Sequence, residues 1–207
     1  MPLVLKETFI ALLHQYTQNN NLVNSYWSEI EKAYMSKDRH YHTLAHLENM
    51  LKELIEIRDL IQEWDTVLFS LYYHDIVYNV LKTTNEELSA EIAQKRLEAI
   101  SVPKQIIENC YQQIIATQKH IQGKNTDTNF FLDADLSILG SDWFSYEQYA
   151  QRVRKEYSIY PDLVYKPGRK KVLRHFLEME RLFKTDAFFN KYESKARKNI
   201  QRELELL

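Results

Sequence analysis

Glycine is scarce in this chain. Only three of the 207 residues are glycine, against an average share of about 7% in soluble proteins. The loops that bind dinucleotides or nucleoside triphosphates need glycine wherever backbone amides approach phosphate. Neither G-x-G-x-x-G nor G-x-x-x-x-G-K is present, which excludes nucleotide-binding enzymes of those two kinds.

Cysteine, long apolar runs and a net charge of either sign are lacking as well. The single cysteine, Cys110, cannot form an internal disulfide, and the first residues do not follow the pattern of a secretory leader. No stretch approaches the ~18 apolar residues that a membrane helix needs. The formal net charge of -2 favours neither a nucleic acid polymer nor an anionic membrane as a partner. We expect a soluble, cytoplasmic protein.

Apolar residues recur at spacings of three and four along nearly the whole sequence, which indicates helices. The first stripes are Leu5, Phe9, Leu12, Leu13 and Tyr16, then Val23, Trp27, Ile30 and Tyr34. The sequence thus predicts an all-α, single-domain helical bundle of about ten helices. Beyond these two stripes, the expected helices cover residues 43–59, 63–79, 85–100, 103–121, 129–139, 142–159, 168–183 and 186–205.

Several residues predict where these helices begin and end. Thr84 with Glu87 fits a capping box, and Pro103 fits the first turn of a helix. The pairs 160–161 (Tyr-Pro) and 167–168 (Pro-Gly) should interrupt the late helices.

A histidine and an aspartate interrupt an otherwise apolar segment, residues 67–81. His74 and Asp75 stand in its middle. Burying both groups costs several kcal/mol unless each is paired, hydrogen-bonded or bound to a metal. A bound cation would supply that compensation. The alternative is a structural pair, either on the helix surface or as a core histidine held by a carboxylate.

Two carboxylates interrupt a second apolar run, residues 130–139. Asp133 and Asp135 stand two residues apart, so on a helix they point about 200° apart. Asp133 is better placed to cap the helix start, and Asp135 to face the interior. The alternative is that both simply belong to a helix start.

The third feature is a pair of histidines, His42 and His46, four residues apart. They share a face if one helix includes both. If Thr43 starts the helix instead, His42 lies on the preceding loop and can point into a cleft. The alternative is a pair of ordinary, partly exposed histidines.

The order His46, then His74-Asp75, then Asp135 on an all-helical chain resembles the HD-domain superfamily of metal-dependent phosphohydrolases. The resemblance covers about residues 40–140, with the helices of residues 142–206 packing on that core. Other stretches resemble a bacterial subgroup described as predicted HD phosphohydrolases. These stretches are residues 85–90 (NEELSA), 154–157 (RKEY) and 196–199 (ARKN).

The resemblance implies a role for each motif residue. It makes His46, His74, Asp75 and Asp135 the ligands of one divalent cation. The Tyr41-His42 and Asp135-Leu136-Ser137 stretches are also similar to cyclic-nucleotide phosphodiesterases, which implies that His42 is the general acid. His42 and Asp75 are thus the candidate catalytic residues.

The same resemblance bears on His120, which lies where binuclear members of the superfamily carry additional histidines. This position implies a ligand to a second metal or a phosphate-binding group, so the count of one ion or two stays open.

The chain departs from the family pattern in two places. Many nucleotidase members carry an acidic residue three places after the aspartate of the dipeptide, where this chain has Tyr78. Glu86 or Glu87 is the substitute, although helix capping explains Glu87 more simply. The glycine-tyrosine-proline extension of cyclic-dinucleotide hydrolases is absent, which argues against that substrate.

Two imidazoles and two carboxylates suit Mn, Fe, Co, Ni or Mg with open positions for water, and Zn is a further candidate. Such an ion activates water for attack on a phosphoester. Candidate substrate-binding residues are His120, Lys119, Glu87, Arg154 and Arg169, the last at an expected helix start. For each cation the alternative is solvated surface charge.

The expected partner is a small phosphorylated substrate, a nucleotide being one candidate. The rival functions are a nucleotide sensor that binds metal without turnover, and a helical adaptor in which the same residues are structural. The sequence leaves the oligomeric state open.

Overall fold

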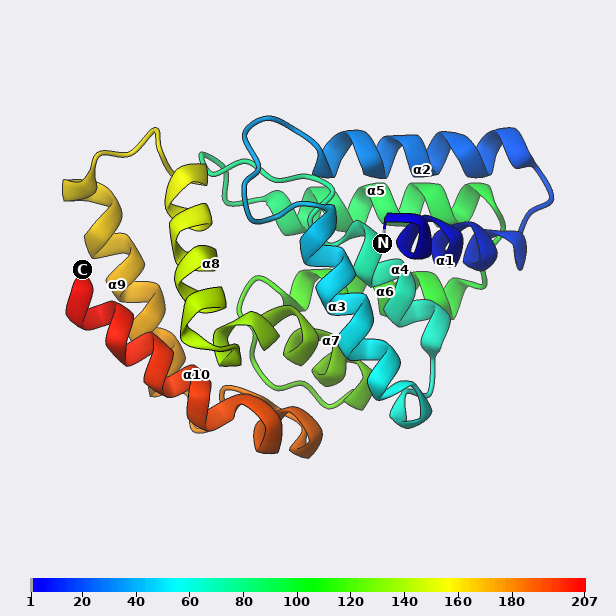
Figure 1. The fold of residues 1–207 in the computed structure, drawn as a ribbon. Coiled ribbons are helices and arrows are strands. Elements are labelled where there is room, and N and C mark those ends of the chain that lie inside the picture. The colour runs from blue at the N-terminus through cyan, green and yellow to red at the C-terminus, as the bar shows by residue number, and fades with distance from the viewer. Residues whose placement is uncertain (1) are drawn as a thin grey trace. The chain divides into compact units, whose positions relative to one another are not determined.

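The structure is a computed structural model that describes residues 2–207 (Figure 1). These residues form ten α-helices, two short 3-10 helices and no strand, so the predicted all-α fold class and helix number are confirmed. Within the same residues, no helix combines the length and apolar character needed to cross a membrane. The elements are α1 (Pro2–His14), α2 (Asn20–Tyr34), α3 (Leu44–Glu56), η1 (Arg58–Leu60), α4 (Trp64–Tyr73), α5 (Asn85–Ala99), α6 (Lys104–Ala116), α7 (Thr126–Leu136), η2 (Ser137–Gly140), α8 (Trp143–Glu156), α9 (Asp162–Glu178) and α10 (Asp186–Leu206).

The chain divides into two compact units, Met1–Leu132 and Asp133–Leu207. Helix α7 crosses the boundary between them. The expectation of one domain over residues 1–207, with a metal-site core at about 40–140, stays a prediction.

The first unit has an aromatic core. Helix α5 packs on α6, and α4 packs on both. The ring of Phe9 meets that of Tyr72 edge-on at 4.8 Å and lies 6.0 Å from that of Trp27, the offset geometry that aromatic pairs prefer. The Tyr72 hydroxyl donates to the carbonyl of Leu5. These contacts fix α1 and α2 against α4, the helix that delivers His74.

The start of α4 is held by a carboxylate from α7. Asp127 accepts hydrogen bonds from the backbone N–H groups of Gln62 and Glu63, at 3.0 and 2.7 Å. Glu63 is the N-cap residue of α4, and a carboxylate there satisfies amides that the helix leaves free. The position of α4 is therefore tied to that of α7 within the first unit.

The end of α4 corrects one sequence prediction. The expected helix over 63–79 stops at Tyr73, so His74 and Asp75 lie at its C-terminal end and not in its middle. The Nδ1 atom of His74 donates a hydrogen bond to the carbonyl of Leu71, and the backbone N–H of Asp75 donates to the Tyr34 hydroxyl. The bond to Leu71 is local, whereas the bond to Tyr34 joins residues 41 positions apart, so no residue near Asp75 in the sequence predicts it.

Helix α6 also ends early, at Ala116 instead of residue 121. The Thr117 hydroxyl donates a hydrogen bond to the carbonyl of Ile114 at 2.7 Å. His120 then adopts a left-handed backbone conformation, with φ of 51°, which few residues other than glycine and asparagine adopt readily. His120 thus lies on a turn beyond the helix.

The predicted capping box at Thr84 and the predicted helix break at residues 167–168 are wrong, whereas the predicted break at residues 160–161 is confirmed. Thr84 is the N-cap of α5 but makes no side-chain capping bond, and the Glu87 carboxylate accepts from Gln118. Residues 160–161 do separate α8 from α9, whereas Pro167 lies inside α9.

Pro167 is tolerated there because the buried residues Tyr165, Arg169 and Leu173 anchor α9 on both sides of it. Because proline has no backbone N–H, the helix lacks one hydrogen bond, near its exposed first turn. Arg169 consequently lies in the middle of α9 and not at a helix start.

In the second unit, α10 packs against η2 and α9, and α8 also packs on η2. A Cβ on Gly140 would lie 2.5 Å from the Cβ of Tyr192, so only glycine lets α10 pass this close to η2. Arg169 and Glu203 form a buried ion pair at 2.8 Å, and the Tyr146 hydroxyl donates to the same carboxylate at 2.6 Å. This network joins α8, α9 and α10.

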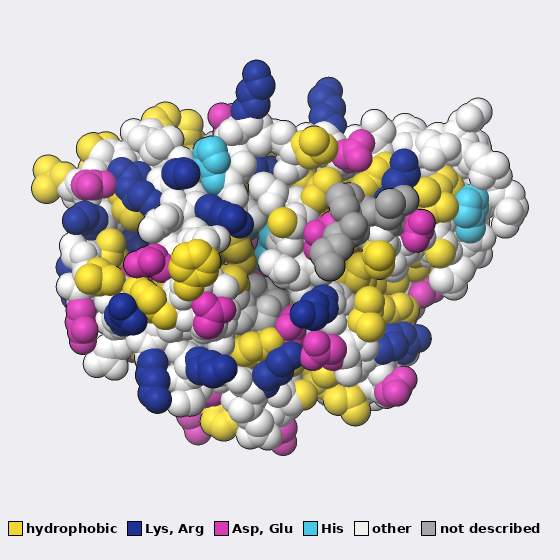
Figure 2. All heavy atoms as spheres, viewed as in Figure 1, with side chains coloured by type: hydrophobic (Ala, Val, Ile, Leu, Met, Phe, Trp, Pro, Cys, Tyr) yellow, Lys and Arg dark blue, Asp and Glu magenta, His cyan; other side chains and the backbone are white. Residues whose placement is uncertain are grey.

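Charges of both signs are interspersed on the face shown in Figure 2, where lysine and arginine side chains lie among aspartate and glutamate. This mixture agrees with the formal net charge of -2.

Candidate metal centre

His46 and His74 meet inside the first unit. His46 lies in the first turn of α3 and is 3% exposed, and His74 follows α4 and is 1% exposed. Their Nε2 atoms are 3.4 Å apart. The Nδ1 atom of His74 lies 3.0 Å from the carbonyl oxygen of Leu71. Because a carbonyl only accepts, Nδ1 donates this hydrogen bond, and Nε2 is left to face the site; in the neutral ring it offers a lone pair to a metal.

Asp75 completes a group of three. Its Oδ2 atom lies 3.3 Å from Nε2 of His74. One ligand atom from each of His46, His74 and Asp75 lies within 4.8 Å of the others, so the group could hold a metal ion. Two ligand atoms about 2.1 Å from one ion, at angles of about 90–110°, are separated by about 3.0–3.4 Å. The two measured separations fit that requirement.

His42 lies on the loop before α3, because Thr43 is the N-cap residue. The prediction that the helix starts at Thr43 and leaves His42 on the preceding loop is therefore confirmed. The His42 ring stacks on that of Tyr78, with centroids 4.3 Å apart, and Nε2 of His42 lies 4.0 Å from Oδ2 of Asp75. Its side chain is 22% exposed against 1% for His74, so His42 lies on the solvent side of the group.

Glu86, at the start of α5, lies near the same group. Burial raises its pKa, as do the negative charges of Asp75 and Glu87, while a backbone hydrogen bond and the positive charge of His120 oppose the rise. Asp75, Glu86 and His120 are thus electrostatic neighbours. Glu87 uses Oε1 to accept from Gln118, and its buried Oε2 has no hydrogen-bond partner.

The other predicted substrate-binding cations are Lys119, Arg154 and Arg169. Lys119 is exposed on the segment after α6. In the second unit, Arg154 donates to Asp162 at 2.8 Å and lies over the ring of Tyr165, and Arg169 pairs with Glu203. Both arginines have structural partners there, and their role in substrate binding stays a prediction.

Asp133 has a structural role that the sequence interpretation missed. Its carboxylate is fully buried and accepts from the backbone N–H groups of Lys184 and Thr185 and from the Thr185 hydroxyl. It therefore holds the chain just before α10, and the expectation that it caps its own helix is wrong, because α7 begins seven residues earlier, at Thr126.

Asp135 lies in the last turn of α7 and is partly exposed. It is one of three carboxylates, with Asp133 and Glu193, whose charges oppose the lowering of the Lys184 pKa by burial. Its role as a fourth metal ligand stays a prediction.

The chain matches no family model, no curated protein and no solved structure. The resemblance to HD phosphohydrolases rests on the motif residues named above. The structure adds one fact to those motifs: residues from two of the three motif segments, 28 positions apart along the chain, form a single group of ligand atoms.

Sequence reasoning missed Arg39 and Tyr34, which surround this group. Arg39 is 8% exposed although arginine is seldom buried without partners. The only sequence signal is its place at the head of the Arg39–His42 stretch.

Proposed function

We propose that this protein is a metal-dependent phosphohydrolase, acting on a small phosphoester such as a nucleotide. The observation that carries the proposal is the convergence of His46, His74 and Asp75, whose ligand atoms lie within 4.8 Å of one another. Two nearly buried imidazoles beside a carboxylate are costly to bury without a shared cation.

His46, His74 and Asp75 would hold the ion, and Asp135 is the predicted fourth ligand. Mixed nitrogen and oxygen donors suit Mn, Fe, Co, Ni or Mg, with Zn a further candidate. When bound, the ion would lower the pKa of a coordinated water and offset charge on a phosphoryl oxygen. The bond from His74 Nδ1 to the Leu71 carbonyl keeps the ring oriented for this task.

His42 would donate a proton to the departing oxygen of the substrate. Imidazoles exchange protons near neutral pH, and His42 lies on the open side of the ligand group, 4.0 Å from Asp75. The stack on Tyr78 fixes the plane of its ring.

Glu86 would take the place of the acidic residue that the family pattern has at the position of Tyr78. Of the two candidate glutamates it is better placed, because the charges of both Asp75 and His120 act on it, whereas Glu87 is bonded to Gln118. Glu86 would accept a proton from the attacking water, and His120 would contact phosphate.

A panel assay tests the function. The full chain is incubated with p-nitrophenyl phosphate, bis-p-nitrophenyl phosphate, nucleoside monophosphates and cyclic nucleotides, each with Mg²⁺, Mn²⁺, Co²⁺, Ni²⁺ or Zn²⁺. We expect hydrolysis that disappears with chelator and in His74→Ala and Asp75→Ala. His175→Ala, an exposed histidine of the second unit, is the matched control and should keep full activity. Hydrolysis that survives in His74→Ala would refute the proposal.

A nucleotide sensor without turnover is the second candidate. Tyr78 favours it, because an aromatic ring stands where many nucleotidases of the family carry an acid. The same panel separates the two functions: tight, metal-dependent nucleotide binding with no product under any metal would identify the sensor.

A further inference from the structure

Two loops of the first unit carry the proton donor and the carboxylate of the candidate site. The loop between α2 and α3, residues 35–43, carries His42, and the segment between α4 and α5, residues 74–84, carries Asp75. Neither loop is held by regular secondary structure at these residues. The 4.0 Å separation between His42 and Asp75 therefore depends on the side-chain contacts that hold each loop, and contacts that join the two loops act on it directly.

Arg39 joins them. Its Nη1 donates to the carbonyl of His42 at 3.3 Å, and its Nη2 donates to the carbonyl of Ile76 at 3.0 Å. The two acceptors lie on different loops, one of them in the residue directly after Asp75. A planar guanidinium has donors in a rigid fork, so it can hold two carbonyls at a fixed separation in a way that a lysine ammonium cannot.

Two tyrosine rings face the same guanidinium. Its Cζ lies 4.8 Å from the ring centre of Tyr34 and 5.4 Å from that of Tyr78, within the range of cation–π attraction. Each tyrosine also contacts a site residue. The Tyr34 hydroxyl accepts from the backbone N–H of Asp75 at 3.2 Å, and the Tyr78 ring stacks on His42 at 4.3 Å.

We propose that Arg39 is a positioning residue that fixes His42 against Asp75 by clamping both loops and both tyrosines. The effect on turnover rests on the proposed function, whereas the effect on the His42 environment does not. His46 belongs to α3, and the His74 ring is bonded to a carbonyl of α4, so the clamp acts on the placement of His42 more than on the histidine ligands.

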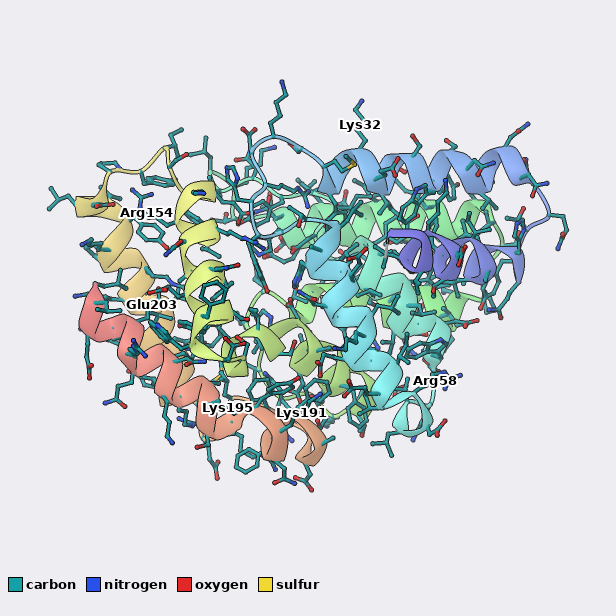
Figure 3. All side chains as sticks on the ribbon, viewed as in Figure 1. Lys32, Arg58, Arg154, Lys191, Lys195 and Glu203 are labelled. Atoms are coloured by element: carbon teal, nitrogen blue, oxygen red, sulfur yellow. The ribbon has the colours of Figure 1, made fainter. Side chains whose placement is uncertain are left out.

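The test compares Arg39→Ala with Arg58→Ala in the full chain. Arg58, labelled in Figure 3, is the matched control because it too lies over an aromatic ring, that of Trp64 at 4.8 Å, and donates to a backbone carbonyl, that of Ile61. Arg39→Lys is the second variant; it keeps the charge and loses the fork, and it serves if Arg39→Ala does not fold.

The first measurement is independent of activity. Diethyl pyrocarbonate modification of His42 is followed by peptide mass spectrometry, with the exposed His175 as internal reference. We expect modification of His42 to be at least about fivefold faster in Arg39→Ala, to rise in Arg39→Lys, and to be unchanged in Arg58→Ala, because only the first two changes break the clamp. Equal His42 rates in the wild type and both Arg39 variants would overturn the proposal.

The second measurement is the split between kcat and KM on the substrate found in the panel assay. We expect kcat of Arg39→Ala to fall by about 10- to 100-fold, as for a misplaced proton donor, with KM and Mn²⁺ affinity within about threefold of the wild type. A fall in Mn²⁺ affinity as large as that in kcat would contradict a positioning role. If the wild type hydrolyses nothing, the proposed function fails, and the His42 modification rates alone decide whether Arg39 is the clamp.

Discussion

The Nε2 atoms of His46 and His74 lie 3.4 Å apart, on side chains that are almost completely buried. The Nδ1 atom of His74 donates to the carbonyl of Leu71, which leaves Nε2 on the side of His46 and Asp75. One ligand atom from each of His46, His74 and Asp75 lies within 4.8 Å of the others, an arrangement that a divalent cation would stabilise.

Replacing each aspartate of α7 by asparagine should affect metal binding at Asp135 and stability at Asp133. Asp135→Asn should weaken Mn²⁺ binding by at least about tenfold, because loss of even an outer-shell partner costs about 10- to 100-fold, and should leave stability nearly unchanged. Asp133→Asn should instead lower the free energy of unfolding by about 1–3 kcal/mol, because three donors from Lys184 and Thr185 lose a full carboxylate.

Calorimetric Mn²⁺ titration and urea unfolding of both variants make this comparison. Mn²⁺ affinity within twofold of the wild type in Asp135→Asn would remove that residue from the ligand set.

Replacing His42 should affect turnover without removing the metal. His42→Ala is expected to lower kcat by about 10²- to 10⁴-fold, the usual contribution of a general acid, while the bound metal stays as in the wild type, since His42 is not among the three ligand residues. Steady-state kinetics and metal analysis of the same preparation check this. A His42 variant that keeps wild-type kcat would exclude the residue as proton donor.

Cys110 offers a probe of metal binding that needs no substrate. It is the only cysteine and is fully buried in α6, and burial raises the pKa of its thiol to about 12. We expect the native protein to react slowly with Ellman's reagent at pH 8, through transient opening. Mn²⁺ at ten times its dissociation constant should slow the reaction by about 11-fold if the opened chain does not bind it. His74→Ala, the control, should show no such slowing, and equal slowing in both proteins would place the Mn²⁺ elsewhere.

Arg169 should matter for stability far more than Arg154. Arg169 is buried against Glu203, whereas Arg154 pairs with a largely exposed Asp162. Figure 3 labels Arg154 and Glu203 on the helices of the second unit. Breaking a buried pair by removing one partner costs about 3–5 kcal/mol, so Arg169→Ala should lower the free energy of unfolding by that amount. Arg154→Ala should cost less than half as much, and equal urea midpoints would contradict the assigned roles.

The helices were predictable because their apolar stripes are long and periodic, as in α2 with its buried Val23, Trp27 and Ile30. Their ends were not. Helix α4 ends where the backbone N–H of Asp75 donates to the hydroxyl of Tyr34, 41 positions away along the chain. No residue near Asp75 in the sequence predicts this helix end. Pro167 wrongly predicted a helix break, because buried neighbours on each side keep α9 intact.

The candidate site was predictable in its histidines and in Asp75, because buried titratable groups in apolar segments stand out in the sequence. Arg39 was not, since an arginine in a loop has the same appearance whether it is solvated or buried between two tyrosines. Asp133 was misassigned for a similar reason: its donors, Lys184 and Thr185, come from a segment about 50 positions later.

Metal analysis of the purified chain determines whether His46, His74 and Asp75 hold an ion. The chain is purified without a histidine tag, supplied with one divalent transition metal, dialysed, and analysed by plasma mass spectrometry beside His74→Ala, Asp75→Ala and the control His175→Ala. We expect about one equivalent of metal in the wild type and the control, and less than about a tenth of that in the two ligand variants. Equal metal content in the wild type and both ligand variants, or none in the wild type, would contradict this expectation.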